Sequence, residues 1–521
     1  MTTAPLSALP IDSLQPLIID RQPLSVTDVV DVARRGRVIG IGPGAQAAME
    51  ASRGMVAALV ERGEVVYGVT TGFGKLADMA IPREAVSLLQ RNLLLSHSVG
   101  VGEPLPRDVV RAMMLLRASS LALGYSGIRP ETVELLVQML NRGITPVVPS
   151  RGSVGASGDL APLAHLALVL IGAGQAEIGG RRVPGGAALA EAGLEPVELQ
   201  AKEGLALING TQLMTAVGAL LVDDAANVLD VADIAGAMSL EAMRGTDRAF
   251  DARAMALRPH AGQGHAATRL RSLLTGSEIL PSHRFDSHRV QDPYSLRCMP
   301  QVHGASRDAL GLLCRAVDTE MSSVTDNPLI FPADGEVISC GNFHGEPLAI
   351  PLDVAAIALA EIGGISERRI EAMLDPHFSE LPAFLTMHGG VDSGFMVSQY
   401  TAASLVSENK ILSHPASVDS IPTSANQEDH VSMGATAALK VRQVLANVEY
   451  ILAIELLCAA EGLDYRLPLR TSPPLEAVRD LIRSEVPHLD DDRVLAPDIE
   501  CVNSMIRDRR LAGAASALID G

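Results

Sequence analysis

Residues 213–243 read LMTAVGALLVDDAANVLDVADIAGAMSLEAM, and the expected architecture follows from them. Apolar residues recur here at three- and four-residue steps, without a proline or a strong break, which is the period of an α-helix. A helix of this length would be about 50 Å long. Because its apolar residues fall on several faces, we expect it to be buried on most sides.

The same pattern returns in four later stretches, residues 302–323, 351–374, 393–412 and 431–463. Isolated helices of this length would be polar all round or supercoiled, whereas these are rich in Ala, Leu, Val and Ile on several faces. We therefore predict a mainly α protein built on a long-helix bundle. The chain before the first long helix is rich in loops, so we predict two domains, residues 1–210 and residues 211–521.

Short helices and glycine-rich loops are expected in the N-terminal domain. Ser25 can cap a helix that ends at Gly36. Further helical patterns occur at residues 45–63, 83–95, 107–123 and 129–142. A small hairpin is expected at residues 176–186, and the two segments at residues 65–77 and 144–158 are predicted to be loops.

The composition restricts the classes of function. Hydrophobic residues make up 47% of the 521 residues but aromatic residues only 3%, so the core must be mainly aliphatic, which favours helices. The net charge of −19 argues against nucleic acid or an anionic membrane surface as a partner. The first residues contain no basic region followed by an apolar run, so we expect no signal peptide. We also expect no apolar stretch long enough to cross a bilayer.

The cysteines indicate a reducing compartment. They are far apart, odd in number and form no C-x-x-C pair: Cys298, Cys314, Cys340, Cys458 and Cys501. This pattern argues against a disulfide framework and a zinc site, and favours free thiols in the cytoplasm. No motif for a nicotinamide, pyridoxal phosphate or metal cofactor is visible, so we expect no metal and neither NAD nor PLP.

Residues 152–159, GSVGASGD, form the most unusual of the predicted loops. Gly, Ala and Ser let backbone atoms approach one another, as a backbone nitrogen must if it is to attack a nearby carbonyl. The alternative is a flexible loop before a helix that Asp159 caps. On physical grounds alone, the second interpretation is favoured.

The longer stretch GSVGASGDLAPLAHLA, residues 152–167, resembles the signature of the histidine and phenylalanine ammonia-lyases. In that family the inner Ala-Ser-Gly cyclises to a methylidene-imidazolone (MIO). The glycine nitrogen attacks the alanine carbonyl, and the serine loses water. The matching residues here are Ala156, Ser157 and Gly158.

Six other segments resemble family blocks and follow in family order. They are YGVTTGFGKLA (67–77), EGLALINGTQ (203–212), QDPYSLRC (291–298), TDNP (325–328), GNFHGEP (341–347) and SANQEDHVSMG (424–434). The resemblance therefore covers most of residues 67–434.

The resemblance implies a base and a carboxylate clamp. Tyr67 matches the family's active-site tyrosine. A phenol titrates near pH 10, so Tyr67 would need a positive field or hydrogen bonds to act as a base at neutral pH. Arg297 would hold the substrate carboxylate through two parallel hydrogen bonds, which a lysine could not copy. The alternatives are a tyrosine packed on a turn and a surface ion pair.

The resemblance also implies groups around the MIO. Asn209, Gln291 and Tyr294 match positions near the MIO and the substrate, and Phe343 matches a residue packed beside the ring. Their alternative is simple loop packing. Asp159 and Asp326 are candidates for assisting ring formation.

Substrate specificity is expected to depend on a Ser-His pair. Histidine-specific members resemble Ser96-His97, whereas tyrosine- and phenylalanine-specific members carry His-Leu or Phe-Leu. His97 would bond one nitrogen of a substrate imidazole, and Glu428 the other. Such a site should reject phenylalanine, because burying unpaired polar groups is costly. The alternative for His97 is a structural histidine.

The resemblance implies a fold and a reaction. The fold would be the long-helix bundle of the fumarase and aspartase superfamily, assembled as a homotetramer whose active sites draw loops from several subunits. The reaction would convert L-histidine to trans-urocanate and ammonia in histidine degradation. The alternatives are a tyrosine or phenylalanine ammonia-lyase, an MIO-dependent 2,3-aminomutase and, more remotely, an inactive helical scaffold.

Overall fold

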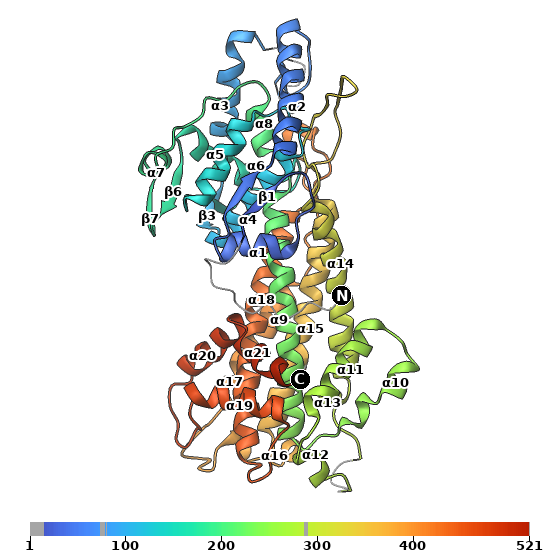
Figure 1. The fold of residues 1–521 in the computed structure, drawn as a ribbon. Coiled ribbons are helices and arrows are strands. Elements are labelled where there is room, and N and C mark those ends of the chain that lie inside the picture. The colour runs from blue at the N-terminus through green and yellow to red at the C-terminus, as the bar shows by residue number, and fades with distance from the viewer. Residues whose placement is uncertain (1–14, 73–78, 80, 286–289, 520–521) are drawn as a thin grey trace.

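The computed structural model describes residues 15–72, 79, 81–285 and 290–519. The signal-peptide prediction concerns residues 1–14, which lie outside the described residues. Residues 73–77 of the predicted loop 65–77 also lie outside them. The described chain forms an elongated molecule with a head of short elements at one end of a long helical bundle (Figure 1). This confirms the predicted mainly α fold.

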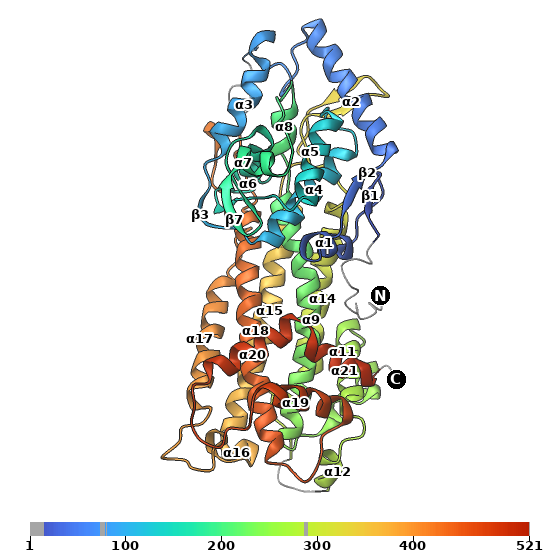
Figure 2. The ribbon, with the colours of Figure 1, turned by 60° about the vertical axis from the view of Figure 1, so that its left-hand side comes forward.

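Four long helices build the bundle (Figure 2): α9 (Gln212–Ala242), α14 (Met299–Glu320), α15 (Glu346–Leu374) and α18 (Gly434–Asp464). The helices α9 and α15 pack on each other, and each also packs on α14 and α18. Two further helices pack on its outside, α11 (Ala261–Leu274) on α14 and α17 (Met396–Leu412) on α15 and α18. The core between them is aliphatic, as the composition predicts. All five predicted long helices are present.

The helix α15 begins earlier than predicted. Its predicted start was residue 351, but it begins at Glu346 and contains Pro351 inside its first turns. Pro347 stands in the first turn, where a missing N–H is tolerated. The hydrophobic pattern does not indicate which of the two prolines, Pro347 or Pro351, lies in the first turn of the helix.

The prediction that no stretch is long enough to cross a bilayer was wrong by length and composition. Glu346–Leu374 and Gly434–Asp464 contain windows of mean hydropathy 1.8 and 1.5. Within the structure, 61% and 78% of these windows are buried, because the two helices pack on each other and on α9. Their apolar surface therefore forms the core of the bundle.

The head contains the predicted short helices, which are α1 (Val26–Arg34), α2 (Pro43–Arg62), η3 (Arg83–Ala85) with α3 (Val86–His97), α4 (Arg107–Ala122) and α5 (Pro130–Asn141). It also contains α6 (Leu160–Leu168), which directly follows Asp159, and three helices outside the predicted patterns, η4 (Val169–Ile171), α7 (Gly185–Glu191) and α8 (Glu203–Ile208). Ser25 caps α1 as predicted, since its hydroxyl accepts a bond from the Asp28 N–H at 3.1 Å. Gly63 ends α2 with a φ of 67°, which favours glycine.

Four small sheets stitch the head together. β1 (Leu17–Ile19) pairs in parallel with β2 (Ile39–Ile41), and β3 (Val101–Pro104) pairs antiparallel with β5 (Pro149–Arg151). β4 (Thr145–Pro146), β6 (Gln175–Ile178) and β7 (Arg181–Pro184) form an antiparallel sheet that contains the predicted hairpin. β8 (Leu329–Phe331) pairs with β9 (Glu336–Ile338).

Short helices complete the far end and the outside of the bundle. They are η5 (Asp247–Phe250), α10 (Ala252–Ala256), α12 (Ile279–Ser282), α13 (Tyr294–Arg297), α16 (Pro376–Ser379), η6 (Ala383–Leu385), α19 (Pro473–Glu485), α20 (Ala496–Arg507) and α21 (Arg510–Ile519); η7 (Ser424–Asn426) precedes α18. The five cysteines are free thiols, as predicted. The predicted domain boundary falls just before α9, and the division into two domains stays a prediction.

Candidate active site

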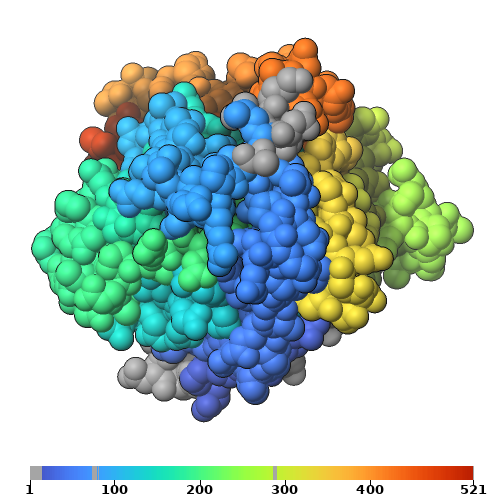
Figure 3. All heavy atoms as spheres, turned by 90° about the horizontal axis from the view of Figure 1, so that it is seen from above, coloured from blue at the N-terminus to red at the C-terminus, as the bar shows by residue number. Residues whose placement is uncertain are grey.

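A cavity of about 1100 Å³ lies in the head. Seen from that end, the surface combines α2 and α3 (blue), the β8–β9 segment (yellow) and the residues before α18 (orange) (Figure 3). Seven of the sequence-predicted site residues line the cavity: Tyr67, Ser96, His97, Ser157, Asn209, Phe343 and Glu428. They come from segments up to about 360 residues apart, so the fold brings them together.

The helix α3 presents one face to the cavity. Residues 89, 92, 93, 96 and 97 line it at helical spacing. The Ser96 hydroxyl lies 3.0 Å from Nδ1 of His97. Burial lowers the pKa of His97 below its ordinary value, against the opposing effects of the Leu93 backbone and the Glu428 carboxylate. The imidazole is therefore neutral at pH 7 and has one donor and one acceptor nitrogen.

The loop with Ala156, Ser157 and Gly158 is tightly packed against the chain before α9. Gly158 has a φ of 71°, and a Cβ placed on it would lie 2.1 Å from the carbonyl oxygen of Gly210. Both the backbone conformation and the space therefore require glycine at this position. The Asp159 N–H donates to the same carbonyl oxygen at 2.6 Å, which fixes the end of the loop.

The Ser157 hydroxyl is directed at a carboxylate. It donates to Oε1 of Glu428 at 3.0 Å, across 271 positions of the sequence. The other carboxylate oxygen of Glu428 accepts a hydrogen bond from the Thr423 hydroxyl. Glu428 is thus held against the serine that the resemblance identifies as reactive.

Asp159 does not cap its own helix, in contrast to the expectation from its position. It is the residue before α6, but its side chain makes no capping bond there. Oδ2 of Asp159 instead accepts the N–H groups of Leu213 and Met214 at 2.9 and 3.1 Å, at the start of α9. Burial raises the pKa of Asp159 to about 7, although these two bonds oppose the shift. A tertiary contact has replaced the local cap.

Asn209 is held by a buried ion pair that sequence reasoning missed. Its Nδ2 donates to Oδ1 of Asp326 at 3.2 Å and to the Asn327 carbonyl at 3.1 Å. The other Asp326 oxygen binds Nζ of Lys202 at 2.8 Å, and both side chains are fully buried. Burial lowers the pKa of Lys202, and the carboxylate of Asp326 opposes this. The position of Lys202, directly before the segment 203–212 that resembles the family, is the feature of the sequence that could have pointed to it.

The remaining predicted residues lie elsewhere in the chain. Gln291, Tyr294 and Arg297 belong to α13 and the segment before it, towards the end of the bundle opposite to α3 and α8 (Figure 1). The Tyr294 side chain is 69% exposed, and the Arg297 guanidinium lies 4.5 Å from the centre of its ring. Nε of Arg297 donates to the Asp292 carbonyl at 3.0 Å. One chain therefore does not bring these three residues to the cavity.

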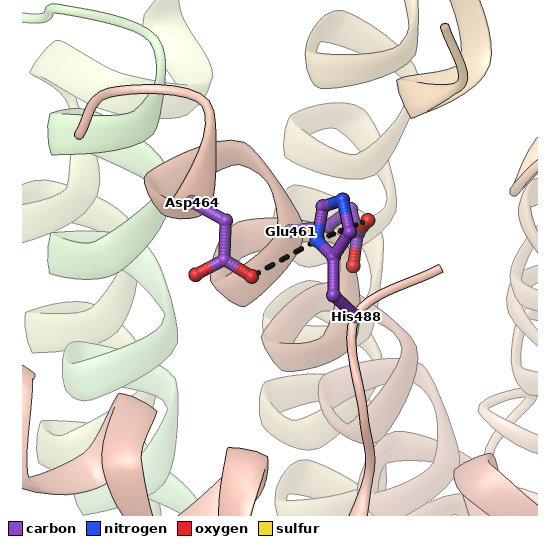
Figure 4. A group of neighbouring side chains, drawn as sticks. All are labelled: Glu461, Asp464 and His488. Atoms are coloured by element: carbon purple, nitrogen blue, oxygen red, sulfur yellow. Dashed lines mark hydrogen bonds and ion pairs between the residues drawn. The ribbon is translucent and has the colours of Figure 1, made fainter. Parts of the chain in front are cut away.

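A second group of ionisable side chains lies near the end of α18. Nδ1 of His488 is 2.8 Å from Oε1 of Glu461 and 3.1 Å from Oδ2 of Asp464 (Figure 4). Arg483 pairs with both carboxylates at 2.7 and 2.8 Å, and Arg479 pairs with Asp464. Because two guanidinium groups already neutralise the carboxylates, this group is an ion network that holds α19 against α18.

The comparisons with known proteins agree with this arrangement. The sequence matches the family model of the aromatic amino acid lyases over residues 24–484. It is 56% identical to a histidine ammonia-lyase from Symbiobacterium thermophilum, over 95% of this chain and 97% of that protein. The solved structure of histidine ammonia-lyase from Trypanosoma cruzi is 44% identical, with a TM-score of 0.90, over 97% of this chain and 96% of that chain. A tyrosine aminomutase from Streptomyces globisporus is 38% identical, with a TM-score of 0.91, over 96% of this chain and 99% of that chain. The chain therefore belongs to the aromatic amino acid lyase family.

Proposed function

We propose that the chain eliminates ammonia from L-histidine and releases trans-urocanate. One observation carries this proposal: Ser157, bonded to Glu428, shares a cavity with the Ser96-His97 face of α3. The likeness to histidine ammonia-lyases, at 56% identity, supports the same substrate.

The residues present fit an MIO group made from Ala156, Ser157 and Gly158. Only glycine fits at position 158, because its φ is 71° and a Cβ there would meet Gly210, and this matches the glycine of the Ala-Ser-Gly sequence. The MIO would supply an electrophile that binds the substrate amine and improves its departure, without PLP or NAD. Asn209 and Phe343 lie in the same cavity and would hold and pack the ring.

The other side chains would recognise the substrate and accept its proton. The neutral His97 can bond one nitrogen of the substrate imidazole, with Ser96 fixing the ring of His97. Glu428 would take the other imidazole nitrogen and supply negative charge beside the amine. Tyr67, which lines the cavity, would accept the β-proton.

We further propose a cytoplasmic homotetramer with shared active sites. Gln291, Tyr294 and Arg297 would complete the cavity of a neighbouring subunit, with Arg297 on the substrate carboxylate. In support, Tyr294 is exposed, and the bundle helices α15 and α17 leave several apolar side chains exposed. They are Ile350, Ile357, Val397, Tyr400 and Ile411. A second subunit would cover such surface.

The second candidate is a 2,3-aminomutase, which returns the ammonia to the β-carbon. The fold likeness to a tyrosine aminomutase favours it. Ser96-His97 and Glu428 argue against phenylalanine, whose hydrocarbon ring would leave these polar groups unpaired, and against tyrosine, whose single hydroxyl could pair with only one of the two sides. An inactive scaffold would have no use for Ser157 beside Glu428.

A substrate panel tests the proposal. The purified protein is incubated separately with L-histidine, L-tyrosine and L-phenylalanine, and the products are separated and identified. We expect urocanate and ammonia in equal amounts from histidine, and little product from the other two. A β-amino acid would establish the aminomutase, and conversion of tyrosine or phenylalanine alone would overturn the assignment of His97 and Glu428.

A further inference from the structure

The Ser153 hydroxyl joins the two ends of the reactive loop. It accepts a hydrogen bond from the Gly155 N–H at 3.1 Å, just before Ala156. It donates to the carbonyl of Gly158, the last residue of the reactive three, at 3.2 Å. One side chain thus spans the segment that must close on itself.

The Ser432 hydroxyl holds the same loop from outside. Ser432 is fully buried in the segment before α18 and donates to the Gly155 carbonyl at 3.1 Å. It accepts the Gly434 N–H, also at 3.1 Å, so the position of the hydroxyl is set by the start of α18. The neighbouring Met433 N–H donates to the Val154 carbonyl at 2.9 Å.

The space around Gly155 shows how close this contact is. Gly155 has a φ of 69°, and a Cβ on it would lie 2.2 Å from the Ser432 hydroxyl oxygen. A side chain at position 155 would therefore displace Ser432. Both ends of the loop are held in a bent conformation by two hydroxyl groups, which we call the hydroxyl clamp (Ser153 and Ser432).

Ring closure is a reaction that depends on such positioning. The Gly158 nitrogen must reach the Ala156 carbonyl carbon, and a free chain would have to lose much conformational freedom to bring these atoms together. A loop already bent by its surroundings avoids much of this loss at the moment of reaction. Neither serine needs to touch the reacting atoms to have this effect.

We propose that Ser153 and Ser432 are positioning residues for the closure of the Ala156-Ser157-Gly158 ring. The bond from the Gly158 nitrogen to the Ala156 carbon forms, and the Ala156 oxygen leaves as water with the Gly158 and Ser157 amide protons. A second water takes the Ser157 hydroxyl and the α-hydrogen of Ser157, so no oxidant is needed. This inference rests on the proposed function, because it assumes that the ring forms.

The test follows ring formation by mass and not by activity. The full chain is made in a cell-free translation system, and samples of the folded fraction are taken over time. The mass of each intact chain shows the fraction that has lost two water molecules. We expect Ser153→Ala and Ser432→Ala to close about tenfold more slowly than the wild type, a loss comparable to one hydrogen bond. Ser153→Thr, which keeps the hydroxyl, should restore most of the rate.

Ser306→Ala is the matched control. Like Ser432, Ser306 is buried and donates one hydrogen bond to a backbone carbonyl, that of Ala358 at 2.9 Å, but it lies in the bundle. The ring of the Ser306→Ala variant should close at the wild-type rate. If the alanine variants do not fold, Ser153→Cys and Ser432→Cys keep the size of the side chain and weaken the bond, and the same slowing is expected.

The outcomes distinguish a failure of the positioning role of Ser153 and Ser432 from a failure of the proposed function. If folded alanine or cysteine variants close as fast as the wild type, the hydroxyl clamp has no positioning role. If the wild type itself keeps its full mass, the proposed function is overturned together with this inference.

Discussion

Polar side chains are buried both in the bundle and in the head, and the two regions differ in the groups that these side chains contact. In the bundle, near the ends of α9 and α15 that lie away from the head, Arg369 and Glu455 are fully buried and make a two-point contact. The hydroxyls of Ser239 and Ser366 also donate hydrogen bonds to the Glu455 carboxylate, at 2.7 and 2.6 Å. In the head, the reactive loop is held by the hydroxyls of Ser153 and Ser432 and by backbone groups. The bundle network thus fixes how the helices pack. In the head, by contrast, the polar contacts shape a loop and hold Asn209 beside a cavity, the second through the buried Lys202–Asp326 pair.

This difference suggests that the polar contacts of the bundle serve stability, whereas those around the reactive loop serve activity. A bundle network that joins α9, α15 and α18 fixes how the helices pack, and its removal should reduce stability. The head network fixes the conformation of a few residues that face a cavity, and its removal should reduce activity more than stability.

The largest effect is expected for Ser157→Ala. Without the Ser157 hydroxyl the electrophile cannot form, so turnover of histidine should fall by about a thousandfold or more. The melting temperature should stay close to that of the wild type, since Ser157 makes a single side-chain bond at the edge of a cavity. Urocanate formation and thermal unfolding are measured on the same sample. Substantial remaining activity would argue against an electrophile at this site.

In the bundle, Arg369→Met should act in the opposite way. It leaves the buried Glu455 carboxylate without its charged partner, and we expect a loss of about 3–5 kcal/mol in the free energy of unfolding. Arg62→Met is the control, because the side chains of Arg62 and its partner Glu64 are 57% and 47% exposed, and it should matter by less than about 1 kcal/mol. Denaturant unfolding measures both variants. Equal stability of the two would show that the bundle network is not structural.

His97→Leu tests the specificity of the head. It removes the polar partner of the substrate ring, so kcat/KM for histidine relative to phenylalanine should fall by about a hundredfold or more. Both substrates are measured with the wild type and the variant. An unchanged ratio would mean that His97 is a structural histidine after all.

Asp159 should give a dependence of stability on pH. Its pKa is raised from the ordinary 3.8 to about 7 by burial, so the protonated carboxyl favours the folded state. The contribution of this protonation is fully present below about pH 4 and is lost as the pH rises through 7. The stability of the wild type relative to Asp159→Asn should therefore fall between pH 4 and pH 7. Denaturant unfolding across this range checks the direction, and a rise would contradict it.

The smallest effect is expected on the surface of the head. Arg181 and Glu191 form an ion pair at 2.8 Å with exposed side chains. Arg181→Ala should change the free energy of unfolding by less than about 0.5 kcal/mol and leave urocanate formation unchanged. A larger effect on either measurement would mean that exposed charges of the head influence the site.

The sequence predicted the helices well because their signals are local. The five long helices follow from apolar periodicity, and Ser25 and Gly63 mark helix ends by capping chemistry within a few residues. The error at the start of α15 arose where two prolines compete locally.

The contacts between distant segments could not be derived from the sequence. Residue patterns do not show that Glu428 meets Ser157, that Lys202 meets Asp326, or that Asp159 binds the start of α9. The resemblance named seven of the residues that line the cavity, but it did not show that Arg297 and Tyr294 lie far from it within one chain. Such facts depend on packing over hundreds of residues.

The mass of the peptide that carries residues 152–159, released by proteolysis from the purified wild-type protein, shows directly whether the chain has made its own electrophile. We predict a peptide lighter than its sequence by two water molecules, and an unmodified peptide from Ser157→Ala. An unmodified wild-type peptide from protein that still converts histidine to urocanate would contradict the central claim that the chain makes its electrophile from Ala156, Ser157 and Gly158.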